Sequence, residues 1–586
     1  MLKKIALSCR TLATRLVLSS KRFPEAIFLA GSVVAVLIFK NHMENILSRD
    51  RLEFFSRISM ILALGIPLSL SIRVFFEKRH LLSVKYKIVT YLLAIVGLSL
   101  YYIFLLKNLH MTSYLRYTAV TISLYCMFAF IPYFYKKKNY EIYIIKILGR
   151  FFITYLYSMI LYAGLIAMFF TIHKLFLIEI SNNIYFDIWL IVLGIFAPTF
   201  FLGDIPKNNE ELEPKCYPKA LKILLLYIVM PLLTAYSVTL YIYFAKILLT
   251  MQWPEGIISH LVMWYSMIAI VVIFSIYPFR EENHWTKKFI RFFPIFVLPL
   301  LAMMFVALGI RINAYGITES RYFCLLIGIW ILGCMVYFIA KKHVRMIVLP
   351  ISVAILSLLS VMGPWDCFSV SALSQTMRFE KILMKYNIIE DGKINKIVQG
   401  ISVDDKKEIR NIISYFTSRQ KLSDLKCLPQ DFNTGQMKSV FGFSNDDDSK
   451  KYFDYSVKEK GDLLDIKNCD YFFHLSAFGE ADNVKKSEMP IYVTYTYKNQ
   501  EITMVKMDQV IYRGDLNTIT TKISNDIKAN NKNVQLLKRN DMMFVDENEN
   551  VKVSYVFKRI GGAEEAGKSV IMSIDFSLLI KVKKSI

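Results

Sequence analysis

The chain has 586 residues, of which 55% are hydrophobic and 14% aromatic, and its formal net charge is +24. The positive charge is confined to the first part: from Asp366 onward there are 34 Lys and Arg against 31 Asp and Glu, which leaves 37 against 16 before it. A basic excess in short loops between apolar segments is typical of membrane proteins and not of a phosphate-binding surface. We therefore expect the lipid bilayer, and no nucleic acid, as a partner.

Up to about residue 365 the apolar residues form blocks of roughly 18–22, the length with which a helix crosses about 30 Å of hydrocarbon. This pattern predicts an all-α polytopic membrane domain over 24–365, followed by a helical linker over 366–449 and a soluble α+β domain over 450–586. About eleven spans are predicted, at 24–40, 58–76, 88–106, 117–135, 151–171, 184–203, 221–248, 257–278, 292–310, 322–340 and 347–363.

The loops between these spans form two alternating sets of different basic content. The N-terminus and the loops at 77–87, 136–150, 204–222, 279–291 and 341–346 hold 26 Lys and Arg. The loops at 40–57, 107–116, 172–183, 249–256 and 311–321 hold nine. Because basic loops are retained in the cytoplasm, we expect a multi-pass protein of the cell (inner) membrane with residues 1–23 in the cytoplasm. No small-residue cleavage site follows the first span, and an odd number of spans places the C-terminal domain outside the cytoplasm.

The early extracytoplasmic loop carries two carboxylates, Asp50 and Glu53. Polytopic glycosyltransferases that use lipid-linked sugars combine about eleven spans with an external domain, and their chemistry needs a carboxylate in such a loop. Arg49, Arg51 and Arg57 interleave with the two acids, so ion pairing at the interface explains them equally well. Glycosyl transfer is an alternative that depends on analogy of span number alone.

Within the spans there is no Asp or Glu at mid-membrane, which disfavours proton relays and sodium sites. Hydroxyl side chains instead form stripes at i, i+3 and i+7 on three spans. Two interpretations are open: glue between helices, or a polar cavity for an uncharged or lipid-like ligand in a transporter or channel that is not ion-coupled. The stripes are Thr118, Thr121 and Tyr125 on the fourth span, Tyr155, Ser158 and Tyr162 on the fifth, and Thr234, Ser237 and Tyr241 on the seventh.

The sequence "RINAYGITESRYF", residues 311–323, joins the ninth and tenth predicted spans on the extracytoplasmic side. We expect Thr318 to cap the tenth helix, Glu319 to lie in its first turn and Arg321 to pair with Glu319. Gly316 can supply a positive φ for the turn. The hairpin is either a capped, ion-paired connection or a binding or gating site. The candidate residues are Arg311, Tyr315, Gly316, Thr318, Glu319 and Arg321.

The segments "IRINAYGITESRYF", "GPWDCFSVSALSQTMRFEKIL" and "IIEDGKI", preceded by the loop "YPFREENHW" (277–285), resemble the bacterial domain-of-unknown-function family 4153. The resemblance covers roughly residues 25–440. It implies a polytopic bacterial membrane protein, and because the activity of the family is unknown, no catalytic residues can be carried over.

Beyond the membrane part, Leu373 and Met377 recur at helical spacing, and Asp405 with Glu408 forms a capping-box pattern before an apolar face. These helices are expected to pack on the β-rich domain or on the membrane surface. From about residue 450 the period changes to two: a hairpin is predicted around 498–500. Further strands are predicted near 452–457, 471–478, 551–558 and 569–582, with a helix near 516–530.

Motifs for chemistry are few. There is no phosphate-binding loop, dinucleotide turn or zinc-binding helix motif, and the eight histidines are scattered singly, so no cofactor or metal site is predicted. Cys427 and Cys469 can form a disulfide in an oxidising compartment, and His474 in an apolar strand can be structural or the centre of a Ser-His-Asp hydrolase. These features favour a non-enzymatic binding, sensing or envelope-scaffold role, with an envelope protein as a possible partner and the oligomeric state open.

Overall fold

A computed structural model of the chain forms two compact units. The first comprises Met1–Leu383 and Ser414–Lys426, and the second Met384–Ile413 and Cys427–Ile586. The structure describes residues 17–78, 84–134, 139–176, 181–206, 217–251, 257–341, 343–390, 393–394, 400–419, 421–429, 431–443, 450–457, 466–478, 484–485, 491–496, 500–506, 509–529, 536–565 and 568–583.

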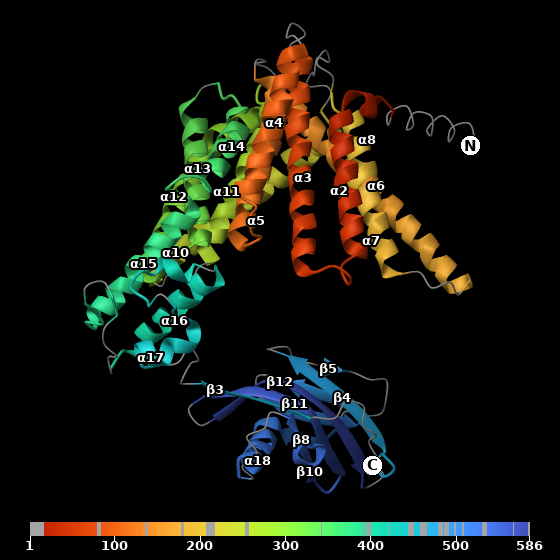
Figure 1. Ribbon diagram of the computed structural model, residues 1–586, viewed down its shortest axis with the longest axis vertical. Helices are drawn as coiled ribbons and strands as arrows, with labels where there is room; N and C mark the ends of the chain where they lie inside the picture. Colours follow the sequence, from red (N-terminus) through yellow and green to blue (C-terminus); the bar gives the residue numbers. More distant parts are fainter. Residues whose placement is uncertain are drawn as a thin grey trace. The chain divides into compact units, whose positions relative to one another are not determined.

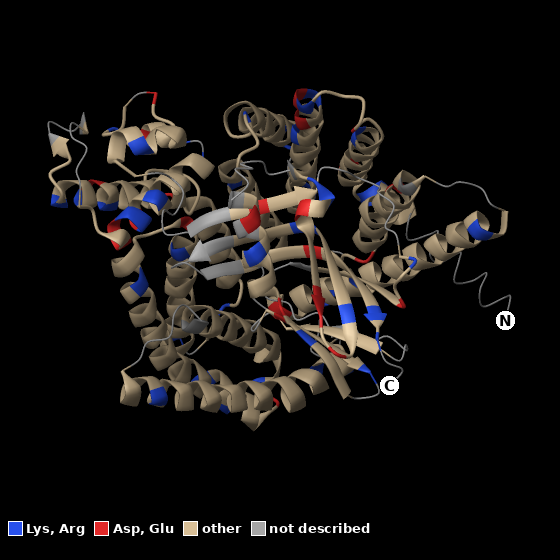
Figure 2. Ribbon diagram, turned by 90° about the horizontal axis from the view of Figure 1, so that it is seen from below, with Lys and Arg blue, Asp and Glu red and all other residues tan. Residues whose placement is uncertain are grey.

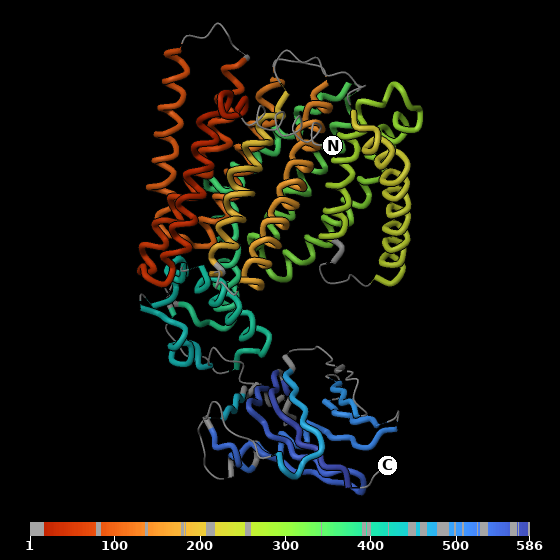
Figure 3. Tube along the Cα trace, turned by 90° about the vertical axis from the view of Figure 1, so that its right-hand side faces the viewer, coloured from red at the N-terminus to blue at the C-terminus, as the bar shows by residue number. Residues whose placement is uncertain are grey.

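The first unit is a bundle of long apolar helices (Figures 1 and 3). Ten helical segments among the described residues are long and apolar enough to cross a membrane, which confirms an all-α membrane domain. The helices are α2 (Pro24–His42), α3 (Arg49–Lys78), α4 (Val84–Phe104), α5 (Met111–Phe130), α6 (Tyr140–Phe176), α7 (Asn182–Ile191), α8 (Ala197–Gly203), α9 (Lys219–Ile223), α10 (Met230–Thr250), α11 (Ile257–Ile276), α12 (His284–Tyr315) and α13 (Glu319–Ala340). Single π-helical turns at Val192–Phe196 and Leu224–Val229 join α7 to α8 and α9 to α10.

The eleventh predicted span is shorter than expected. Its regular helix, α14, covers only Val348–Leu359, about 18 Å at 1.5 Å per residue. The chain nevertheless runs from one end of the bundle to the other here. Val344 bonds to Tyr277 at one end, and Asp366 pairs with Arg116 at the other. The described residues therefore contain ten long apolar helices. Because the shorter α14 segment also passes along the bundle, the chain leaves the bundle at the end that an odd number of crossings predicts.

The two alternating loop sets gather at opposite ends of the bundle. At the N-terminal end the guanidinium of Arg22 donates to both carboxylate oxygens of Glu77, at 3.0 and 2.9 Å, and to the carbonyl of Ile205 at 2.7 Å. At the other end His42 bonds to Asp187 at 2.7 Å. Loops that were assigned to one side by their charge thus contact one another.

The bundle core is apolar and centred on α11, α12 and α13. Ala269, Ile273, Val297 and Met335 are completely buried. Pro294 and Pro299 both lie inside α12.

Figure 2 shows little charge along the membrane helices and both signs of charge on the strands, as the counts of charged residues in the sequence imply.

After α14 the chain forms α15 (Cys367–Lys385) and α16 (Val403–Ser418), separated by the short strands β1 (Ile389–Glu390) and β2 (Lys393–Ile394). The helix α16 begins three residues earlier than predicted. Ser402, not Asp405, precedes it: the Asp405 amide donates to the Ser402 hydroxyl at 3.2 Å, and that hydroxyl donates to the Asp405 carboxylate at 2.8 Å. A short helix, α17 (Met437–Phe441), follows.

From residue 450 onward the second unit contains two sheets and one long helix, which confirms an α+β region. The larger sheet has the order β4-β12-β11-β3-β9, with β10 also paired to β11, and the smaller has the order β5-β6-β7-β8. All pairs are antiparallel except β3 with β9. The elements are β3 (Lys450–Val457), β4 (Tyr471–Phe478), β5 (Val484–Lys485), β6 (Ile491–Thr496), β7 (Glu501–Lys506), β8 (Gln509–Asp515), α18 (Leu516–Ala529), β9 (Leu536–Leu537), β10 (Met543–Glu547), β11 (Val551–Glu565) and β12 (Lys568–Val582).

The predicted strands and the predicted helix are all present. In the hairpin β6–β7, Ile491 pairs with Lys506 and Thr496 with Glu501, because alternating apolar residues place one face in the core. The turn at 498–499 lies outside the described residues. One apolar core joins both sheets to α18, and Phe557 and Phe576 are completely buried in it.

The disulfide between Cys427 and Cys469, which the sequence left open, is not formed among the described residues. Cys427 is buried and Cys469 is partly buried. The six cysteines that are described carry no bond to one another.

Candidate functional site

The hairpin between α12 and α13 is a tight turn that accepts only glycine at its centre. Gly316 has a φ of +68°, and its amide donates to the carbonyl of Ile312 at 2.7 Å. A Cβ atom at this position would lie 2.7 Å from Cδ of Arg378 and 2.8 Å from Nε2 of Gln375. The predicted positive φ is confirmed, and close packing by α15 is a second reason for glycine.

Side chains from α15 and α13 satisfy the backbone of this turn. Arg378 donates to the carbonyl of Ala314 at 2.7 Å, and Gln375 donates to the carbonyls of Tyr315 and Ile317 at 3.2 and 3.0 Å. The amide of Ile317 donates to the hydroxyl of Ser374 at 2.9 Å. The last carbonyls of a helix have no partner within the helix, so these bonds fix α15 to the end of α12.

Arg321 has a different role from the one predicted. Its guanidinium donates to the carbonyls of Tyr315 and Gly316, at 3.1 and 2.7 Å, and not to Glu319. Residues two apart on a helix do not face each other, which explains why the predicted pair does not form. Thr318 precedes α13 as expected, but its side chain makes no capping hydrogen bond.

Glu319 instead binds two residues of the segment 414–419. Nε and Nη2 of Arg419 donate to its two carboxylate oxygens, each at 2.7 Å, and the hydroxyl of Tyr415 donates to Oε1 at 2.9 Å. The side chains of Glu319 and Arg419 are only 9% and 20% exposed. The guanidinium of Arg419 also lies 3.7 Å from the centroid of the Tyr415 ring. We call Glu319, Tyr415 and Arg419 the hairpin clamp.

Two features stabilise the hairpin clamp. Paired, bidentate Arg–carboxylate bonds are the strongest type of ion pair in proteins, and partial burial keeps water from competing. Burial and the Glu319 carboxylate raise the pKa of Tyr415 above its usual value. The Tyr415 hydroxyl therefore stays protonated and remains a hydrogen-bond donor.

Comparison with known proteins identifies the family. A family model described as "Domain of unknown function (DUF4153)" matches residues 26–389, more than half of the chain. The chain belongs to the DUF4153 family. The match ends at residue 389, short of the expected 440, so Glu319 lies inside the DUF4153 region while Tyr415 and Arg419 lie beyond it.

An "Uncharacterized protein PM1469" of Pasteurella multocida (strain Pm70) is 21% identical over 234 residues. The alignment spans 38% of this chain and 40% of that relative. No solved structure matches the chain.

Within the DUF4153 region, the polar stripes mostly bond to their own helices. The hydroxyls of Thr118, Thr121, Ser158 and Thr234 each donate to the carbonyl four residues earlier. The seventh-span stripe also makes contacts between helices. Ser237 bonds to Tyr265 of α11, and the hydroxyl of Tyr241 donates to the carbonyl of Phe296 in α12 at 2.6 Å. The hydroxyl groups of this stripe therefore hold α10 against α11 and α12.

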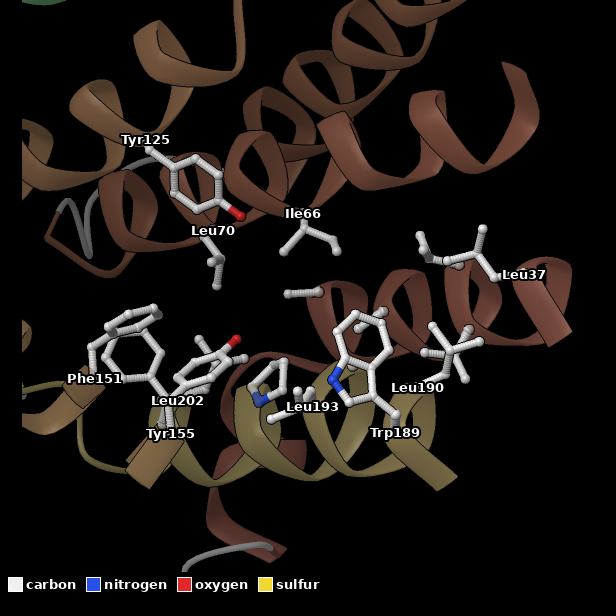
Figure 4. Close-up of a pocket in the computed structure, with 17 residues that line it drawn as sticks. Leu37, Ile66, Leu70, Tyr125, Phe151, Tyr155, Trp189, Leu190, Leu193 and Leu202 are labelled. Carbon is white, nitrogen blue, oxygen red and sulfur yellow. The ribbon is translucent and has the colours of Figure 1, made fainter. Parts of the chain in front are cut away.

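A cavity of about 350 Å³ lies between α2, α3, α5, α6 and the α7–α8 segment. Tyr125 and Tyr155, from two of the stripes, lie at its wall together with Trp189 (Figure 4). No described residue of α10 lines it. This cavity therefore does not join the fourth, fifth and seventh spans, as the transporter alternative requires. Tyr162 makes no hydrogen bond within the described residues.

The carboxylates of the early loop are not arranged as the glycosyltransferase alternative needs. The Oε1 atom of Glu53 accepts from the amide of Leu109 at 3.0 Å, while Asp50 is exposed in the first turn of α3. The alternative explanation, ion pairs of these acids with Arg49, Arg51 or Arg57, is not seen among the described residues either, and the guanidinium of Arg57 lies 4.4 Å from the centroid of the Tyr102 ring. The described residues contain no group of three or more His, Cys, Asp or Glu that could hold a metal ion.

His474 lies between Asp575 and Ser577 of the neighbouring strand β12, with both contacts at 3.3 Å. Ser577 is only 1% exposed, so a substrate carbonyl cannot approach its hydroxyl. This arrangement is a packed strand pair and not a hydrolase triad.

Residue spacing could not have found the partners of Glu319. Tyr415 and Arg419 lie 96 and 100 residues from it in the chain. The only local indication of a distant partner was that Glu319 has no basic residue three or four positions later, where a partner on the same helix would lie.

Proposed function

We propose that this DUF4153 protein is an inner-membrane protein that displays its α+β unit outside the cytoplasm and acts by binding, as a sensor or an envelope scaffold. The hairpin clamp carries the proposal. It joins the DUF4153 bundle to the segment of chain that leads into the second unit.

The chain crosses between the two units three times, after Leu383, after Ile413 and after Lys426. The hairpin holds α15, which ends next to the first crossing, and residues 415 and 419, which lie between the second and third. A force or displacement on the α+β unit is thus passed to the α12–α13 hairpin by covalent links and by the hairpin clamp. Such a connection suits a protein that reports or maintains a bound state.

The direction of display follows from the charge of the loops. The end of the bundle that holds Arg22 and Glu77 includes the loop set with 26 Lys and Arg, and the hairpin lies at the end with nine. Positively charged loops favour the cytoplasm, so the hairpin and the segment that follows α14 face outward. Binding is supported by the apolar side chains that the second unit exposes, namely Phe472, Val510 and Val545, each about half exposed.

The proposal is tested in living cells. A reporter fused after Ile586 should be active outside the cytoplasm. A photoreactive amino acid at position 472, 510 or 545 of the full chain should give a discrete adduct with an envelope component, in lower yield in the Glu319→Gln variant. The control is Lys421→Gln, which removes one charge from an exposed pair with Asp424 nearby and should leave the yield unchanged. A cytosolic reporter, or adducts that are identical in both variants, would refute the proposal.

A further inference from the structure

A second feature of the hairpin is a cluster of three arginines that the hairpin clamp does not use. Arg311 comes from the last turns of α12, Arg321 from the first turn of α13 and Arg378 from α15. Arg321 and Arg378 both donate to backbone carbonyls between Ala314 and Gly316. Arg311 and Arg378 lie close enough to Arg321 to repel it electrostatically. We call these three residues the arginine cluster.

The positive charge of the arginine cluster is not balanced by a carboxylate of the hairpin. Glu319 is the acidic residue of the hairpin, and Arg419 occupies both of its oxygens. Arg311 makes no ion pair or hydrogen bond with any described residue. The helix C-terminus offers only about half a negative charge, against the guanidinium groups of Arg311 and Arg321. The site therefore has a net positive charge and attracts an anion.

The surroundings of the arginine cluster indicate which anion binds. Tyr315, Leu373 and Met377 are each more than half exposed, and the cluster lies at one end of the membrane bundle (Figure 1). Leu373 and Met377 lie on the outward face of α15, whose opposite face is buried through Gln375 and Phe379. An amphipathic helix with exposed apolar side chains beside cationic ones is suited to the headgroup level of a bilayer.

We propose that the arginine cluster binds the phosphate of an anionic phospholipid in the leaflet that surrounds the α12–α13 hairpin. Guanidinium groups present paired N–H donors that match phosphate oxygens, and Arg311 has all of its donors available. The acyl chains then cover Leu373 and Met377. This site is independent of the proposed binding role of the α+β unit, because it uses none of the residues of the hairpin clamp.

The test uses the full chain purified in a neutral detergent. Phosphatidylglycerol, phosphatidylcholine and inorganic phosphate are added separately, and lipid binding is followed by native mass spectrometry and by the shift of the thermal unfolding temperature. We expect phosphatidylglycerol to bind and to stabilise, and phosphatidylcholine and inorganic phosphate to do neither. In Arg311→Gln the affinity for phosphatidylglycerol should fall about fivefold, the effect of one basic side chain at a membrane surface.

Arg311→Gln is the informative variant because Arg311 supports no described backbone group, whereas Arg321 and Arg378 also hold the turn. Arg51→Gln is the matched control, since Arg51 is exposed in the first turn of α3 at the same end of the bundle. It should keep the affinity of the unsubstituted chain. Equal loss in both variants would show general charge attraction and would overturn the site. An equal response to inorganic phosphate would overturn its assignment to a lipid.

Discussion

Glu319 and Arg419, separated by 100 residues in the chain, form a two-point ion pair in which both bonds measure 2.7 Å. This pair connects the start of α13 to the segment Ser414–Lys426, which belongs to the first unit and lies between two parts of the second. The hairpin therefore not only connects α12 to α13 but also binds the segment that contains Arg419.

Removal of the Glu319 charge should loosen the segment 414–419. Glu319→Gln leaves the guanidinium of Arg419 mostly buried without a counter-charge, which costs ~3 kcal/mol for pairs of this kind. We expect the amides of 414–419 to exchange with solvent roughly 100-fold faster, measured by hydrogen-exchange mass spectrometry of the full chain. Unchanged exchange in this segment would contradict the burial and pairing described above. The Lys421→Gln variant, which alters an exposed pair, serves as the control.

Gly316→Ala should destabilise the bundle. An alanine at a φ of +68° is strained, and its Cβ would meet Arg378 and Gln375 at under 3 Å, so we expect a loss of ~2 kcal/mol or more and a lower thermal unfolding temperature. Gly309→Ala is the matched control, because Gly309 lies within α12 and a methyl group added there would have no atom within 4 Å apart from the nearby backbone of its own helix. That substitution should be neutral or slightly stabilising. Equal behaviour of the two variants would show that the turn is not strained.

Ser352→Ala should weaken the contact between α13 and α14. The indole Nε1 of Trp330 donates to the hydroxyl of Ser352 at 2.9 Å, and such bonds between membrane helices contribute ~0.6 kcal/mol on average. Ser357→Ala on the same helix removes a hydroxyl that bonds only within α14, to the carbonyl of Ala354. In detergent, the thermal unfolding temperature of Ser352→Ala should be lower than that of Ser357→Ala. The reverse order would mean that the Trp330 bond does not hold α14.

Asp405 should stabilise α16 only above acid pH. Hydrogen bonds from Lys385, then Tyr386 and Ser402, lower the pKa of Asp405 to about 2. Because the folded-state pKa lies below the unfolded value of about 4, the stabilisation is complete above that value and disappears as the pH falls through about 2.

We therefore expect Asp405→Asn to increase hydrogen exchange in the first turn of α16 at pH 6, after correction for the intrinsic rate, and to have little effect near pH 2. Asp404→Asn, at the exposed neighbouring position, is the control and should have no effect at either pH. A constant difference between Asp405→Asn and the unsubstituted chain across this range would contradict the assignment.

The sequence predicts those features of the structure that depend on local patterns. Runs of apolar residues predicted the long helices, and alternation predicted the hairpin β6–β7, because each pattern reflects which face is removed from water. Gly316 at the centre of the turn was also predictable, since its neighbours end one apolar run and begin the next. The short helix α14 was overestimated because Ser360 and Gly363 interrupt a segment that is apolar enough to be read as a full span.

Pairings between distant segments were not predictable. The partner of Glu319 was sought at Arg321, within the hairpin, because nothing in a single sequence links position 319 to position 419. The face of α15 that contacts the hairpin was not predictable for a similar reason: Leu373 and Met377 are apolar but exposed, while Gln375 is buried and bonds to the hairpin. Hydrophobic side chains mark the core only where the surrounding medium is water. At the end of a membrane bundle, apolar side chains can face lipid, so hydrophobicity does not identify the buried face there.

The most direct test of the hairpin clamp is a double-mutant cycle of Glu319→Gln and Arg419→Gln, measured as hydrogen-exchange protection of residues 414–419 in the full chain. If the two side chains bind each other as described, each single variant should lose most of the protection that the double variant loses, with a coupling energy of at least ~1.5 kcal/mol. If the two losses simply add, within about 0.5 kcal/mol, the ion pair does not join the bundle to this segment and the account is wrong.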